Sequence, residues 1–234
     1  MKPLRKIVIA VDGHSSCGKS TVARQVAGAL GIAYIDTGAM YRAVTLAAMR
    51  RGLIVGGRPD AGAVEALMPD VDIAFAYDPA TGANRTMLCG EDVEDEVRSM
   101  AVSQAVSPVS ALPAVRAGLT ALQRRMGEEG SVVMDGRDIG TVVFPGADLK
   151  IFMTARPEVR ARRRYEEMLA KGLSPVFDEV LANVVARDEQ DSSRAVAPLR
   201  KADDAVVLDN SDISRQEQFD FIVDCLVRRG LVGE

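Results

Sequence analysis

The chain has 234 residues, a net charge of −4, 47% apolar residues and only 4% aromatic residues. This size and composition are typical of one sizeable globular domain with an insertion, or of two small domains, and they argue against disorder and coiled coil. A nucleic-acid partner is not expected, because the chain lacks both a basic surplus and the aromatic residues on which bases stack.

The pattern of apolar residues and cysteines favours a cytoplasmic protein without a membrane partner. The first apolar run, Ile7–Val11, is too short for the core of a secretion signal and ends at Asp12. No apolar stretch of the sequence approaches the length of a membrane span. Cys17, Cys89 and Cys225 lack metal-ligand spacing and suit a reduced setting.

Taken in chain order, five short apolar runs predict the buried strands of a sheet. They are Ile7–Val11, Ala33–Asp36, Val132–Asp135, Leu149–Met153 and Val206–Asp209. Helical patterns lie between most of these runs, so the sequence predicts an α/β fold with a parallel sheet covered by helices on both faces.

Two helices are predicted from apolar residues at helical spacing. The first follows the first strand and carries Val22, Val26 and Leu30. The second lies near the C-terminus, with an apolar face at positions i, i+3, i+4, i+7 and i+8 that consists of Phe219, Ile222, Val223, Leu226 and Val227.

Residues 57–112 interrupt the alternation of strands and helices. The segments VDIAFAY (71–77) and RTMLC (85–89) flank the turn-forming segment DPATGAN (78–84), which predicts a β-hairpin. A short helix is expected to begin at Glu94. We interpret this stretch as a subdomain inserted into a single domain that spans residues 1–234.

The segment from Gly13 to Ser20 matches the phosphate-binding motif G-x-x-x-x-G-K-[ST] in full, between a predicted strand and a predicted helix. Gly13 and Gly18 allow the backbone N–H groups to converge on phosphate oxygens, and the helix offers its positive end. Lys19 can reach the β- and γ-phosphates, and the Ser20 hydroxyl can bind Mg²⁺. The residues expected to bind the nucleoside triphosphate are Gly13, His14, Ser15, Ser16, Cys17, Gly18, Lys19, Ser20 and Thr21.

Within this loop, His14 and Cys17 are interpreted as loop residues rather than as catalytic groups. His14 is the only histidine of the chain, and the sequence offers it no partner.

The rest of the sequence favours a kinase over a switch GTPase or a motor ATPase. The D-x-x-G and N-K-x-D strings of GTPases do not occur, and Asp135 is followed by Gly136 rather than by the glutamate typical of motor ATPases. Four clusters of arginines and carboxylates occur instead, at 36–42, 135–138, 156–164 and 187–194. The first three follow predicted strands, where open α/β sheets bind their ligands.

Each cluster also allows a simpler interpretation. Arg42 could be a solvated helix residue, and Arg137 with Asp138 a surface turn pair. The arginines of 156–164 could form an ordinary helix face, supported by an Arg163–Glu167 pair at i,i+4. The row Arg187, Asp191 and Arg194 could be a surface salt bridge. Their combination with a phosphate loop favours the functional interpretation.

Over nearly its whole length the chain resembles the bacterial-type cytidylate kinases, a group of nucleoside monophosphate kinases. The resemblance is carried by GHSSCGKST, DTGAMYR, GEDV, VSPVSALPAVR, DGRDIGTVVFP and RDEQDSSRAVAPL. It departs from the family in the loop, where His14 and Cys17 replace the small residues or proline that are more usual.

This resemblance implies a P-loop three-layer fold with a five-stranded parallel sheet, a monophosphate-binding insertion at 57–112 and a helical lid at 156–174. It implies transfer of the terminal phosphate of ATP to CMP, and also to dCMP, with Mg²⁺, in pyrimidine nucleotide metabolism. We expect a monomer whose partners are these nucleotides.

The resemblance also implies roles for individual residues. Thr37, Arg116 and Asp138 would face the cytosine, while Arg42 and Arg137 would bind the acceptor phosphate, in a substrate site that also includes Tyr41. Ser107 and Asp191 would hold the ribose hydroxyls. Arg187 and Arg194 would lie beside the phosphates, as catalytic residues together with Lys19 and Arg137, and Arg156 would begin the row of lid arginines that closes over ATP.

Two alternatives stay open at this point. One is a P-loop kinase for another small acceptor, such as UMP or a hydroxylated metabolite. The other is a nucleotide-dependent switch or binding module without transferase activity, against which the missing GTPase motifs count.

Overall fold

The computed structural model describes residues 1–78 and 83–233, and the chain divides into two compact units. We call the first the sheet unit; it comprises Met1–Tyr34 and Glu129–Glu234. The second, Ile35–Glu128, is called the helical unit.

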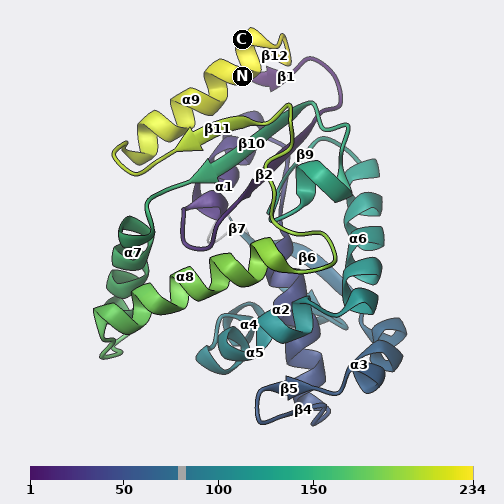
Figure 1. Cartoon of the computed structure of the whole chain (residues 1–234). Coiled ribbons are helices and arrows are strands. Elements are labelled where there is room, and N and C mark those ends of the chain that lie inside the picture. Colours follow the sequence, from purple (N-terminus) through teal and green to yellow (C-terminus); the bar gives the residue numbers. More distant parts are fainter. Residues whose placement is uncertain (79–82, 234) are drawn as a thin grey trace. The chain divides into compact units, whose positions relative to one another are not determined.

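A five-stranded parallel sheet forms the centre of the sheet unit, in the order β11-β10-β2-β9-β3 (Figure 1). Its strands are β2 (Val8–Gly13), β3 (Ala33–Asp36), β9 (Val132–Gly136), β10 (Leu149–Thr154) and β11 (Val206–Asp209). The middle strands β2 and β9 are almost entirely buried, because a parallel sheet covered by helices has no solvent face. The predicted α/β fold and its five strands are confirmed.

Helices α1 (Lys19–Leu30) and α9 (Arg215–Arg228) pack on the core of this sheet. Val22, Val26 and Leu30 of α1 are buried, as predicted. In α9, Ile222 and Leu226 are fully buried, but Val227 is 55% exposed. The predicted apolar face of α9 is therefore wrong at its last position. The buried side of α9 runs along Gln218, Ile222 and Leu226 instead.

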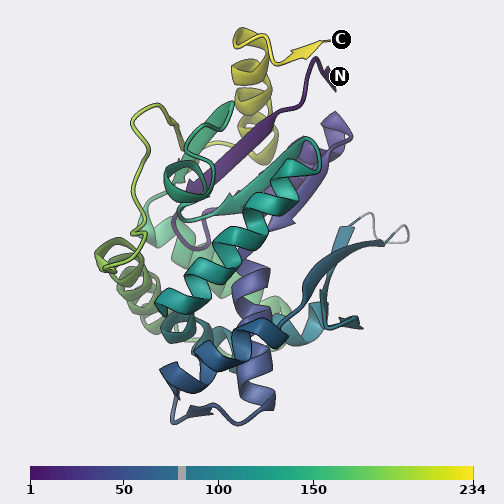
Figure 2. The ribbon, with the colours of Figure 1, turned by 90° about the vertical axis from the view of Figure 1, so that its right-hand side faces the viewer.

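The two ends of the chain meet in a small antiparallel pair within the sheet unit. Strand β1 (Lys2–Pro3) pairs with β12 (Val232–Gly233), and Figure 2 shows the termini beside each other. Strands of two residues carry no periodic signal, so the sequence did not predict them.

Three further elements of the sheet unit contain predicted site residues or directly follow them. The π-helical turn η2 (Ile139–Val143) follows β9, and α7 (Pro157–Ala170) follows β10. Helix α8 (Phe177–Ser193) packs against α7 through a small apolar cluster around Ala161, Val180 and Val184. That residues 156–174 close as a lid stays a prediction.

The helical unit contains the expected hairpin. Strands β6 (Ile73–Asp78) and β7 (Ala83–Leu88) pair antiparallel, which confirms the hairpin; residues 79–82 of its predicted turn lie outside the described residues. The expected short helix is α4 (Glu94–Val97). The other elements are α2 (Thr37–Arg50), β4 (Ile54–Val55), β5 (Arg58–Pro59), α3 (Ala61–Leu67), η1 (Met68–Asp70), β8 (Glu91–Asp92), α5 (Met100–Ser110) and α6 (Pro113–Glu128).

Among the described residues, no helix taken alone has both the length and the apolar character needed to cross a membrane. Helices α5 and α6 meet this criterion only when they are counted together, and the chain bends by 99° between them.

Candidate active site

The phosphate loop connects β2 to α1, and its two motif glycines are required by the backbone. Gly13 has a φ of +148°, and a Cβ atom there would lie 2.0 Å from the carbonyl oxygen of Met153 in β10. Gly18 caps the N-terminus of α1 in the left-handed conformation, with a φ of +87°. Side chains at either position would strain or displace the loop, so the motif is explained by local geometry.

Lys19 is held inside the loop by a backbone carbonyl group. Its side chain is buried, and Nζ donates a hydrogen bond of 2.6 Å to the carbonyl oxygen of His14. Burial lowers the pKa of Lys19, and the positive charge of Arg137 lowers it further. An anion bound in this loop would therefore relieve an unfavourable buried positive charge.

The two unusual loop residues make contacts with the loop and the core. The Cys17 thiol is fully buried and donates to the carbonyl oxygen of His14 at 3.0 Å. The His14 ring packs edge-on against Phe152, with 5.9 Å between the ring centroids. Burial lowers the pKa of His14 despite the opposing charge of Asp188. A neutral His14 fits its interpretation as a loop residue, which stays a prediction.

Asp135 is a neighbour of the loop for which the sequence analysis predicted no separate role. Its carboxylate, at the end of β9, accepts hydrogen bonds from the Ser20 hydroxyl at 3.0 Å and from the Tyr34 hydroxyl at 2.7 Å. Strands β2 and β9 are adjacent in the sheet, so their carboxyl ends bring the loop and Asp135 together. Mg²⁺ prefers one or two such oxygen ligands together with phosphates and water, and Ser20 with Asp135 fits this preference.

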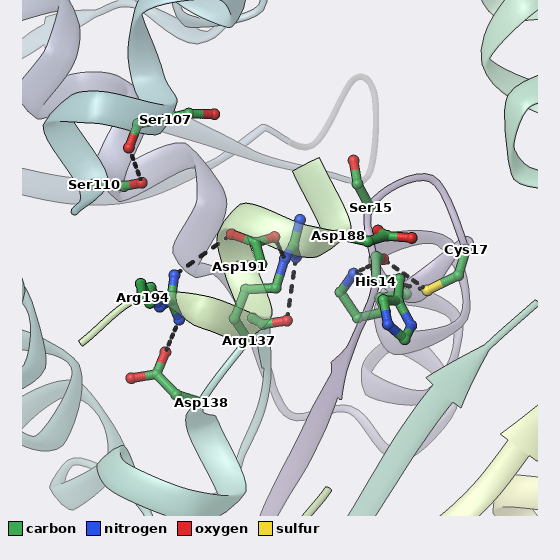
Figure 3. A network of polar contacts seen from close by, with 12 residues as sticks. His14, Ser15, Cys17, Ser107, Ser110, Arg137, Asp138, Asp188, Asp191 and Arg194 are labelled. Atoms are coloured by element: carbon green, nitrogen blue, oxygen red, sulfur yellow. Dashed lines mark hydrogen bonds and ion pairs between the residues drawn. The ribbon is translucent and has the colours of Figure 1, made fainter. Parts of the chain in front are cut away.

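A second group of charged side chains gathers at the C-terminal end of α8 (Figure 3). Nε of Arg137 donates to Asp191 at 2.7 Å, and Arg194 lies 3.5 Å from Asp191 and 3.7 Å from Asp138. Burial alone would raise the pKa of Asp191, but the positive charges of Arg137, Arg194 and Arg187 outweigh it and keep the pKa low.

These contacts join two of the sequence clusters, 135–138 and 187–194, within the sheet unit. The side chain of Arg194 is only 11% exposed and that of Asp191 is 20% exposed. The row on α8 is thus no solvated salt bridge, and Arg137 with Asp138 is no isolated surface turn pair.

One arginine of α7, Arg160, contacts both the phosphate loop and α8. Arg160 is buried and binds both oxygens of Asp188, at 2.9 and 2.6 Å, while its Nη1 also donates to the carbonyl oxygen of Ser15 at 3.3 Å. This pair was not predictable from the sequence, because Asp188 lies 28 residues away on another helix.

Of the expectations for the other lid arginines, the one for Arg163 is wrong and the one for Arg156 stays a prediction. Arg163 bonds to Asn210, not to Glu167, which pairs with Lys171 instead. This happens because Asn210 follows β11 and offers both its side-chain and its backbone oxygen. Arg156 forms an exposed ion pair with Asp212, at 2.6 Å, and its role in ATP binding stays a prediction.

Asn210 is a further residue that sequence reasoning missed. It is 1% exposed, and its amide nitrogen donates to the Cys17 carbonyl oxygen at 2.6 Å and to the Gln218 side chain at 2.8 Å. A single asparagine at a strand end has no sequence signature, although here it supports the backbone of the phosphate loop.

The remaining predicted substrate residues lie in the helical unit. Arg42 is partly buried and donates to the Ser103 hydroxyl at 2.8 Å and to the Val97 carbonyl oxygen at 3.2 Å, so it is not a solvated helix residue. The buried guanidinium of Arg116 lies over the ring of Tyr41, 5.3 Å from its centroid.

The last two predicted substrate residues of the helical unit occupy helix positions. Thr37 is buried at the first position of α2, directly after the capping residue Asp36. Ser107 lies on α5, where its carbonyl oxygen accepts from the Ser110 hydroxyl at 2.9 Å.

We expect Asp191→Ala to lower kcat/KM for CMP by roughly ten- to a hundredfold, since hydrogen bonds to charged groups contribute ~1.5–3 kcal/mol. The variant removes the carboxylate that accepts from Nε of Arg137 and that is expected to bind the ribose. Steady-state kinetics with CMP, together with a thermal melt, measure this effect. Asp224→Ala, which breaks an exposed ion pair with Arg228, is the matched control. Unchanged kinetics in Asp191→Ala would contradict a role for this row in acceptor binding.

Comparison with known proteins places these motifs in one family. A sequence model of the family described as "Cytidylate kinase" matches residues 9–228. The chain is 54% identical to a cytidylate kinase of Porphyromonas gingivalis over 91% of this chain and 92% of that protein. It is 51% identical to one of Bacteroides thetaiotaomicron over 94% of this chain and 96% of that protein.

Among solved structures, the chain is similar in fold to an uncharacterized protein from Eubacterium ventriosum. The TM-score is 0.52 with 12% sequence identity, over 96% of this chain and 99% of that chain.

Proposed function

The chain belongs to the cytidylate kinase family, and we propose that it transfers the terminal phosphate of ATP to CMP and dCMP, giving CDP or dCDP and ADP. The observation that carries this proposal is the pairing, in one unit, of a complete phosphate loop around Lys19 with the charged group of Arg137, Asp138, Asp191 and Arg194. The first part suits a triphosphate donor, and the second suits an acceptor that bears its own phosphate.

The chemistry of a monophosphate acceptor needs no general base. The second pKa of a phosphate monoester is ~6, so at neutral pH its oxygen is already an ionised nucleophile. The enzyme has to bring two polyanions together, align them and neutralise the charge on the transferred group. Holding the reactants together can supply on the order of 7–11 kcal/mol of the barrier.

We assign the donor side to the phosphate loop. Its backbone N–H groups and Lys19 bind the phosphates of ATP. Ser20 with Asp135 would hold Mg²⁺, which would supply additional charge neutralisation. Because water must be excluded for transfer to win over ATP hydrolysis, residues 156–174, with their arginines beginning at Arg156, are proposed to act as a lid.

We propose the following roles on the acceptor side. Arg137 and Arg42 bind the acceptor phosphate, and Arg187 and Arg194 neutralise the phosphoryl group. Asp191 and Ser107 bind the ribose, and the cytosine contacts Asp138, Arg116 and Thr37, with Tyr41 beside Arg116. Residues 57–112 contribute the monophosphate-binding insertion. We further propose a cytoplasmic monomer that binds neither nucleic acid nor a membrane.

The test of this function is ADP release measured with CMP, dCMP, UMP, AMP and shikimate as acceptors. We expect kcat/KM to be highest for CMP and dCMP. An enzyme that turns over UMP or shikimate faster than CMP would contradict the proposal, and ATP turnover that no acceptor accelerates would point to a switch or binding module.

Base recognition gives a sharper prediction at Asp138. Cytosine presents an N4 amino donor and a bare N3 acceptor, whereas uracil presents an O4 acceptor and an N3–H donor. A carboxylate at Asp138 accepts from cytosine N4 but repels uracil O4, and the Arg116 guanidinium, which has donors only, can satisfy cytosine N3 but not uracil N3–H. Such a contact contributes roughly 1–3 kcal/mol of discrimination.

Asp138→Asn replaces the carboxylate by an amide that can donate to uracil O4. We expect the CMP-to-UMP ratio of kcat/KM to fall by roughly tenfold or more, measured at one pH and one salt concentration. Asp203→Asn, at an exposed position, is the control. If both rates fell together at a constant ratio, Asp138 would belong to the phosphate or metal site and not to the base.

A further inference from the structure

Asp12 is a buried carboxylate that the proposed chemistry does not use. It is the residue before Gly13, at the end of β2, and only 5% of it is exposed. Its two oxygens accept hydrogen bonds from two successive backbone N–H groups, Ile139 at 2.8 Å and Gly140 at 2.7 Å. Each oxygen thus has its own donor, and both bonds span more than 120 residues of sequence.

The two N–H groups belong to the first residues of η2, directly after Arg137 and Asp138. The turn packs closely against its neighbours. A Cβ atom added at Gly140 would lie only 3.3 Å from an Asp12 oxygen and 3.1 Å from a side-chain carbon of Lys150. The same carboxylate therefore stands next to the phosphate loop in sequence and against the Arg137–Asp138 turn in space.

We propose that Asp12 is a positioning residue, which fixes the turn carrying Arg137 and Asp138 in register with the phosphate loop. This inference rests on the proposed function, in which these two residues bind the acceptor. Groups that transfer a phosphoryl group must be held within fractions of an ångström, and a displacement of about 1 Å can cost on the order of a hundredfold in rate. Two charge-assisted hydrogen bonds to backbone groups provide such a constraint.

The protonation of Asp12 sets the conditions of the test. Burial raises its pKa to about 6, the charge of Asp138 raises it as well, and the two backbone N–H groups and Lys19 oppose this. At pH 8 the carboxyl group is ionised and accepts from both N–H groups, so the experiments are done at this pH.

Asp12→Asn is the near-isosteric variant, whose amide keeps one acceptor oxygen and turns an NH₂ group toward a backbone N–H. We expect kcat/KM for CMP to fall by roughly ten- to a hundredfold, because the turn that carries Arg137 and Asp138 is no longer held in place. The CMP-to-UMP ratio of kcat/KM should fall as well. The Kd for ATP should stay within about threefold of the wild-type value.

Asp148→Asn is the matched control. Asp148 accepts the backbone N–H of Val8, at the opposite end of β2, with a bond of 2.8 Å. Its loss should lower the melting temperature without changing the CMP-to-UMP ratio. If donor and acceptor kinetics changed in step in Asp12→Asn, or if its kinetics were unchanged, the positioning role would be overturned.

Amide hydrogen exchange of Ile139 and Gly140 gives a readout that does not depend on activity. Faster exchange at these two amides in Asp12→Asn, together with the selective loss on the acceptor side, supports the proposal; faster exchange without that loss overturns it. If Asp12→Asn folds poorly, Gly140→Ala is the second variant, because its methyl group crowds Asp12 while the carboxylate is kept. We expect it to show the same selective loss in acceptor kinetics. The proposed function itself is judged separately, from the preference of the wild-type enzyme for CMP.

Discussion

Lys19→Ala is expected to lower kcat by roughly 100- to 1,000-fold, the loss typical of removing one group that stabilises charge developing in a transition state. Lys19 is the buried cation of the phosphate loop, and its ammonium group donates to the His14 carbonyl oxygen. Coupled measurement of ADP release at saturating ATP and CMP gives kcat directly.

The same variant should keep or gain thermal stability. Because the folded-state pKa of Lys19 is lowered, the folded protein holds the charged form less favourably than the unfolded chain does. This penalty is present below the folded-state pKa and is relieved as the pH rises through it. Removing the ammonium group removes the penalty.

The control for this prediction is Lys201→Ala, at an exposed lysine outside the site. Activity of Lys19→Ala within threefold of wild type, at a normal melting temperature, would show that the loop does not work through its lysine.

The sequence predicted those parts of the fold and site that depend on short-range patterns. The five strands follow from compact apolar runs, and the ends of Ala33–Asp36 and Val206–Asp209 agree with the structure. The phosphate loop follows from residue types at fixed spacing, because Gly13 and Gly18 must adopt backbone conformations that other residues avoid.

The contacts that the sequence did not predict join residues far apart in the chain. Asp12 bonds to amides 127 and 128 residues away, and Arg160 pairs with Asp188 across two helices. Such partners depend on which strands lie side by side, and on the loops that this order brings together. Arg163 illustrates the point: a local rule proposed Glu167, but the end of β11 offers Asn210 with two acceptor oxygens.

The apolar spacing of α9 predicted the middle of its buried face but not the edge of that face. The apolar spacing in α9 correctly placed Ile222 and Leu226 in the core but extended the face to the exposed Val227. Phe221, which is off the pattern, packs partly against the same core. The sheet that the helix covers decides how wide its buried face is, and the sequence of the helix alone does not contain that information.

Arg137→Lys is the second prediction with a large expected effect, a fall of roughly a hundredfold in both kcat and kcat/KM for CMP. Arg137 is held by Asp191 through Nε, and the charge of this carboxylate raises the arginine pKa although burial alone would lower it. A guanidinium can bind Asp191 and still offer a planar pair of donors to a phosphate, whereas an ammonium group on a flexible stem cannot do both. A hundredfold loss corresponds to about 2.7 kcal/mol, within the range for hydrogen bonds to charged groups.

The matched control for Arg137→Lys is Arg228→Lys, because Arg228 also binds an aspartate through two nitrogens, at 3.1 and 2.8 Å, but on an exposed surface. Its kinetics should equal those of the wild type, since exposed ion pairs contribute little. The companion variant Arg42→Lys applies the same test to the helical unit. If KM rose in Arg137→Lys while kcat stayed constant, Arg137 would bind the acceptor without stabilising the transition state. Wild-type kcat and KM in Arg137→Lys would show that Arg137 only forms a structural pair with Asp191. The acceptor phosphate would then need another ligand.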